Sequence, residues 1–82
     1  MKRIILGIQI GHREAEAVKV QELLTKHGCI IKTRLGLHEA GNLCSSKGLV
    51  ILEFIPGNDK EVEQLKVELE KLDEVVVGMM TF

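Results

Sequence analysis

Residues 48–55, with the sequence GLVILEFI, are followed directly by Pro56-Gly57. The run is almost continuously apolar, has the length of an ordinary strand and ends at a strong turn signal. A strand that is apolar on both faces is typical of the middle of a sheet. We therefore expect a central strand over residues 48–55, with the other elements arranged around it.

Three other segments also have strand patterns. Residues 3–10 (RIILGIQI) place apolar side chains on one face at period two, and residues 29–37 (CIIKTRLGL) alternate in a similar way. Residues 75–82 (VVVGMMTF) are apolar at nearly every position. We expect a strand in each of these segments.

Two segments have the three- and four-residue spacing of amphipathic helices. The first covers residues 13–27, and the second follows Asn58, which has the spacing of a capping box with Glu61. Gly28 is predicted to cap the end of the first helix. The inward stripes are Ala17, Val20, Leu23 and Leu24 in the first helix, and Val62, Leu65, Leu69 and Leu72 in the second.

The order β-α-β-β-α-β predicts an α+β fold in a single domain over residues 1–82. With right-handed crossovers, the strands form a four-stranded antiparallel sheet in the order 4-1-3-2, with both helices on one face. This is the ferredoxin-like arrangement.

The sheet face without helices is predicted to be apolar, whereas an antiparallel sheet usually presents polar residues to water. Such a patch is typical of an interface, so we expect a homodimer or a homotetramer. The alternative is a monomer whose strand register differs by one residue. Regular alternation places these residues on that face: Ile5, Ile30, Leu49, Ile51, Val75, Val77 and Met79.

Composition narrows the function. The chain has a net charge of −1, no Trp or Tyr, and no C-x-x-C motif. This argues against nucleic-acid binding by the chain alone and against the redox and metal motifs built on C-x-x-C. No apolar run is long enough to span a membrane and no signal-peptide cleavage site follows the first strand, so we expect a cytoplasmic protein. No hydrolase triad is placed on strand-to-helix turns, so we expect no enzyme activity.

The strand order, the turn after the first strand at Gly11, and the passage KHGCII over residues 26–31 resemble ACT domains. The stretches IQI (8–10), TRLGLHE (33–39), CS (44–45) and GLVIL (48–52) resemble the small stand-alone ACT-like proteins described as regulators of the iron-only hydrogenase system. This resemblance implies a regulatory domain that binds a small effector at an oligomer interface and acts on a partner protein.

An effector site is predicted where the first strand meets the first helix, at Gly11, His12 and Arg13. Backbone N–H groups at a helix start favour anions, and Arg13 could pair with a carboxylate. Arg34 is predicted on the sheet face without helices, where it reaches a ligand or forms an inter-subunit ion pair. Glu39, in the following loop, could contribute to ligand binding. The alternative is an ordinary solvated turn.

The chain also resembles the metal-sensing domain of the nickel-responsive repressor. His38 and Cys44 match two ligand positions of that domain in their spacing, whereas Gly36 stands where a further His is expected. This implies, as an alternative function, a metal sensor or carrier in which His38 and Cys44, with Glu39, bind a transition metal. A third alternative is a structural assembly module without a ligand.

Overall fold

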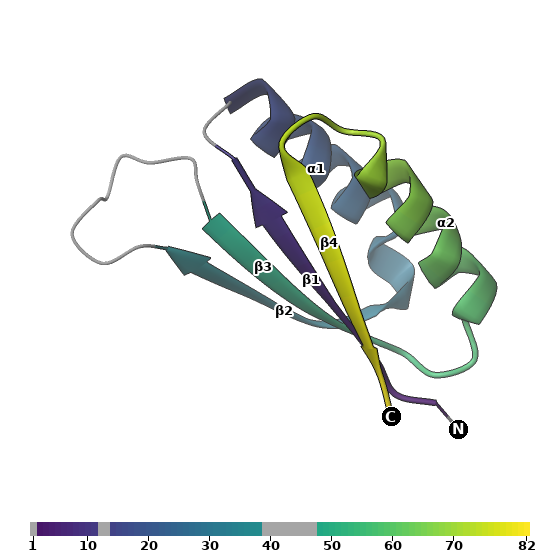
Figure 1. Cartoon of the computed structure of the whole chain (residues 1–82). Coiled ribbons are helices and arrows are strands. Elements are labelled where there is room, and N and C mark those ends of the chain that lie inside the picture. The colour runs from purple at the N-terminus through teal and green to yellow at the C-terminus, as the bar shows by residue number, and fades with distance from the viewer. Residues whose placement is uncertain (1, 12–13, 39–47) are drawn as a thin grey trace.

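The fold is described by a computed structural model covering residues 2–11, 14–38 and 48–82 (Figure 1). Each predicted helix and strand is present within one or two residues of its expected bounds. The elements are β1 (Ile4–Ile10), α1 (Glu14–Lys26), a short 3₁₀ turn η1 (Gly28–Ile30), β2 (Ile31–His38), β3 (Gly48–Phe54), α2 (Asp59–Glu70) and β4 (Val75–Thr81).

The strands form one antiparallel sheet in the order β2-β3-β1-β4, which is the predicted order written from the other edge. Figure 1 shows α1 and α2 side by side on one face of this sheet, and no helix of the described residues lies on the other. The chain ends lie together because the backbones of Arg3 and Phe82 exchange hydrogen bonds of 3.2 and 2.9 Å. The predicted ferredoxin-like fold is therefore confirmed.

The core lies between the two helices and the sheet, and it is almost entirely aliphatic. Leu6, Ile8 and Leu52 from the central strands are fully buried against Val20 of α1 and Leu65 of α2. Burying one such side chain contributes about 1.5–3 kcal/mol. The helices thus bury the central strands on one face of the sheet, and the described helices leave the opposite face uncovered.

An irregularity at the start of β2 reverses the faces predicted for that strand. Ile31 pairs with Phe54, but Thr33 pairs with Glu53, so the register shifts between Ile31 and Thr33. Because a bulge adds one residue to one strand, every later side chain changes sides. Arg34, predicted on the uncovered face, lies instead on the helix side.

Strand β4 also has the opposite facing to the one predicted. Val75, Val77 and Met79 pair with Ile10, Ile8 and Leu6, and directly paired residues share a face, so these three lie on the helix side. Ile30 was likewise predicted on the uncovered face, but it lies in η1 and is buried in the core. The predictions for Ile5, Leu49 and Ile51 are confirmed by their register.

The ends of the helices differ in detail from the prediction. Asn58 precedes α2 but makes no side-chain cap bond; its Nδ2 donates to the carbonyl oxygen of Ile55 at 2.9 Å. Helix α1 ends at Lys26, and Gly28, which was predicted to cap it, is the first residue of the 3₁₀ turn that leads into β2. Within the described residues, neither helix is long and apolar enough to cross a bilayer.

Candidate functional site

The sheet face opposite the helices carries an apolar patch, which we call the uncovered face. Its side chains come from all four strands, and several are well exposed: Leu35 at 53% and Val76 at 63%. Soluble monomers rarely leave such a contiguous apolar surface in water. The apolar residues of the uncovered face are Ile5, Leu35, Leu37, Leu49, Ile51, Val76 and Met80.

A shallow hollow of about 440 Å³ lies in the uncovered face over β3, β1 and β4. Gly7 and Gly78 pair across these two strands, so the sheet has no side chain at the centre of the hollow. A Cβ atom at Gly78 would meet nothing within 4 Å, and one at Gly7 would only touch Ile51 at 3.8 Å. Apart from the polar residue Gln9, the hollow is lined by apolar residues and glycines, so it suits a largely apolar group.

One end of the uncovered face is polar. Glu53 pairs with Thr33 and lies 3.2 Å from Arg3 Nε and 4.0 Å from Lys32 Nζ. These ion pairs are partly exposed and contribute little to stability. An apolar centre beside a charged margin is the usual anatomy of a protein interface.

The described strand ends next to most of the predicted effector and metal residues in the sequence lie together at one end of the sheet. Ile10 pairs with Gly48, and Gly48 pairs with His38, so β1, β2 and the start of β3 meet there. His38 is the last residue of β2. His12, Arg13, Glu39 and Cys44 lie outside the described residues, so their roles stay predictions.

Gly11 at this end is in close contact with the start of β4. Its N–H donates to the carbonyl oxygen of Glu74 at 2.9 Å. A Cβ atom at Gly11 would lie 2.7 Å from the Cβ of Glu74 and 3.2 Å from its carbonyl oxygen, and Glu74 itself has a φ of 58°. Since real Cβ atoms do not approach so closely, this position accepts only glycine without a backbone shift.

Arg34 contacts α1 instead of the uncovered face. Its Nη2 donates to Oε1 of Gln21. The placement of Arg34 at a seam formed by the uncovered face is therefore wrong, because the bulge in β2 turns this side chain towards the helices. A ligand role for Arg34 stays a prediction. The ligand would then lie at the edge of β2 beside α1.

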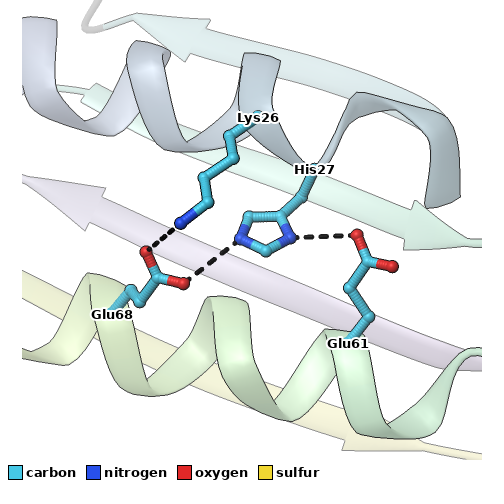
Figure 2. A network of polar contacts seen from close by, with 4 residues as sticks. All are labelled: Lys26, His27, Glu61 and Glu68. Atoms are coloured by element: carbon cyan, nitrogen blue, oxygen red, sulfur yellow. Dashed lines mark hydrogen bonds and ion pairs between the residues drawn. The ribbon is translucent and has the colours of Figure 1, made fainter.

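The sequence analysis missed a polar network between the helices, shown in Figure 2. The side chain of His27 is 6% exposed; its Nδ1 lies 3.0 Å from Oε2 of Glu61 and its Nε2 3.3 Å from Oε1 of Glu68. Lys26 also reaches Glu68, at 3.4 Å. Glu61 and Glu68 are two helical turns apart on one face of α2, which is the sequence signal that could have revealed the network.

The carboxylate of Glu68 responds to these neighbours. Burial raises the pKa of Glu68. Hydrogen bonds and positive charge from Lys26 and His27 lower the pKa by more than burial raises it, so the net pKa lies below the ordinary value of 4.5. An ionised Glu68 is thus the stable partner of the network at neutral pH. The network holds the helices together on the face away from the sheet's apolar patch, so its role is structural.

The metal hypothesis stays a prediction. Among the described residues, no three His, Cys, Asp or Glu side chains gather closely enough to hold a metal ion, and Cys29 is exposed. Metal analysis of untagged protein, with and without Cys44→Ser, tests it. Metal that only the wild type retains supports a site at His38 and Cys44, and no metal in either protein rejects it.

No protein-family model matches the chain, and no curated protein matches it. Solved structures do match. One is an uncharacterised protein, TM1266, from Thermotoga maritima, with 24% identity and a TM-score of 0.83 over 100% of this chain and 99% of that chain.

Two further matches are more distant. Prephenate dehydratase from Streptococcus mutans has 15% identity and a TM-score of 0.64 over 95% of this chain and 40% of that one. CPII from Thiomonas intermedia K12, in a structure bound to ADP, AMP and acetate, has 18% identity and a TM-score of 0.56 over 99% of this chain and 86% of that one. At these identities the likeness establishes the ferredoxin-like fold of the chain.

Proposed function

We propose that this chain is a cytoplasmic, non-enzymatic regulatory module that self-associates through the uncovered face and binds a small effector near the resulting seam. The observation that carries the proposal is the apolar patch on the sheet face that the described helices leave uncovered. The regulatory consequence is that an effector at the seam would change how two copies fit together, and with it the surface offered to a partner protein.

Covering the uncovered face is a large favourable contribution to association. The apolar side chains of the uncovered face already have part of their surface buried. Covering the rest would stabilise the complex by roughly 1 kcal/mol per side chain, or about 5–10 kcal/mol in total before the cost of association. A domain of 82 residues has a net stability of about 4–12 kcal/mol. Covering this face is therefore comparable in size to the stability of the fold itself.

The effector class follows from the fold likeness and from the predicted site. CPII is described as a nitrogen regulatory PII-like protein, and its structure holds ADP, AMP and acetate, which are small anions. In the sequence, Arg13 directly precedes α1, so the segment Gly11-His12-Arg13 supplies one positive charge next to a helix start, which suits the same anions. We infer a small anionic effector at this turn.

Leu35→Glu tests the self-association. It places a charge on the uncovered face at a position that is already 53% exposed, so the monomer fold tolerates it. Val18→Glu on α1 is a matched control at 55% exposure on the other side of the molecule. Light scattering at micromolar concentration should show a dimer or tetramer for wild type and Val18→Glu, and a smaller species for Leu35→Glu. A monomeric wild type refutes the proposal.

Thermal-shift measurements with amino acids, ADP, AMP and acetate test the effector. A ligand at 100 times its Kd stabilises the folded state by about 2.7 kcal/mol, which is an easily measured shift in Tm. We expect at least one compound to shift the wild type and to lose its effect on Arg13→Ala. If no compound shifts the wild type, the effector is rejected and the structural-module alternative stands.

A further inference from the structure

The two edges of the sheet differ sharply in how they are protected against pairing with another strand. β2 carries Lys32 and Arg34 and begins with a bulge, which are devices that block edge pairing. β4 (VVVGMMT) is seven residues long and contains no charged residue and no proline. Among the described strands β4 pairs only with β1, so its outer edge is open.

The hydrogen bonds fix which backbone groups of β4 point outward. Arg3 and Phe82 exchange both bonds, so they form a hydrogen-bonded pair of the antiparallel ladder. Such pairs alternate along a ladder, which assigns the N–H and C=O groups of Val76, Gly78 and Met80 to β1. The outward groups therefore belong to the remaining residues of the strand: Val75, Val77, Met79 and Thr81.

This outward set is complementary to itself. If two copies of β4 run antiparallel about a two-fold axis at Gly78, Val77 faces Met79 of the other copy and Val75 faces Thr81. Each outward residue then uses its donor and its acceptor, which gives about eight backbone hydrogen bonds. Gly78 meets itself at a closely spaced pair, where the absence of a side chain removes any clash.

We propose that the edge of β4 binds a second copy of this chain and joins the two four-stranded sheets into one continuous sheet. A second copy is the occupant favoured by the structure because the strand is uncharged, so like strands do not repel, and because Gly78 lies at the two-fold axis, where two copies can approach without a side-chain clash. Met79 is 44% exposed and Thr81 is also exposed, so α2 does not cover this part of the edge.

The contact is separate from the one in the proposed function and extends it. Val76 and Met80 belong to the uncovered face and sit on β4, so pairing at the edge makes the apolar patches of two copies continuous. A face contact and an edge contact together build a tetramer from dimers, whereas either contact alone gives a dimer.

Residue-resolved hydrogen exchange on the wild type is the direct test. If the edge is paired, the amides of Val77 and Met79 exchange slowly, like those of Gly78 and Met80, and at least about a hundredfold more slowly than unprotected amides. If Val77 and Met79 exchange fast while Gly78 and Met80 stay protected, the edge is free and the inference is overturned. That result leaves a contact through the uncovered face intact.

Met79→Pro provides the matching perturbation. Proline removes the outward N–H of residue 79 while the ladder to β1 keeps its bonds, as proline at sheet edges usually does. We expect the variant to lose the edge contact, so its mass falls by half relative to the wild type and Val77 loses protection. Unchanged mass with unchanged protection of Val77 overturns the inference. Met79→Lys, which adds an edge charge without constraining the backbone, should act in the same way if the proline variant fails to fold.

Discussion

The network around His27 predicts an unusually large loss of stability from a single substitution outside the apolar core. The ring nitrogens of His27 lie 3.0 Å from Oε2 of Glu61 and 3.3 Å from Oε1 of Glu68, within hydrogen-bond distance of both carboxylates. Hydrogen bonds to charged groups are worth about 1.5–3 kcal/mol each. The side chains of Glu61 and Glu68 are 41% and 31% exposed, so screening brings each bond towards the lower end of that range.

We therefore expect His27→Ala to lower the free energy of unfolding by about 2–3 kcal/mol. For a domain of this size, that corresponds to a fall in Tm of roughly 10–20 °C. Urea unfolding at neutral pH and at one fixed protein concentration measures the loss, since association would otherwise change the apparent stability.

Lys26→Ala is the control because Lys26 precedes His27 in the chain and also contacts Glu68, at 3.4 Å (Figure 2). Its side chain is 63% exposed, so its removal should cost less than about 1 kcal/mol. If His27→Ala costs no more than Lys26→Ala, the ring does not hold the helices together and the reasoning fails. His27→Leu, which keeps the volume but removes the bonds, should fall between the two.

Two other predictions follow from single contacts. In thermal melts, Gly11→Ala should destabilise the fold by about 2 kcal/mol or more, because the new Cβ would lie 2.7 Å from the Cβ of Glu74. Gly28→Ala is the control: its Cβ would meet nothing within 4 Å, so stability should change by less than about 1 kcal/mol. The pKa of Glu68 is lowered in the folded state, so the stabilisation by its carboxylate is complete above pH 4.5 and is lost as the pH falls through the folded pKa. Glu68→Gln should therefore flatten the acid side of the plot of unfolding free energy against pH. An unchanged plot would contradict this.

The order and type of the elements could be predicted because each has a clear period and a clear boundary. The central strand is apolar on both faces and ends at Pro56-Gly57, and the helices have regular inward stripes. These features depend on neighbours in the chain. The His27 network could not be predicted in the same way, because it joins α1 to α2 through residues 34 and 41 positions apart.

The faces of the strands were the weak point, and the reason is physical. Period two assigns residues to a face only while the strand is regular. The shift between Ile31 and Thr33 reverses β2, and no glycine or proline marks it in the sequence. In β4 every position is apolar or glycine until Thr81, so the pattern carries no information about which residues face the helices.

The apolar uncovered face was nevertheless predicted correctly, because the errors in β4 exchange one apolar set for another. Val76 and Met80 take the place of Val77 and Met79. A conclusion about the character of a surface is therefore insensitive to register, whereas a conclusion about a single charged residue is not. Arg34 was predicted on the uncovered face but contacts Gln21 on α1. The irregularity in β2 thus leaves the interface argument intact but changes the position of Arg34, the one charged ligand candidate that the structure describes. An effector bound through Arg34 would therefore act at the edge of β2 beside α1, and not between two uncovered faces.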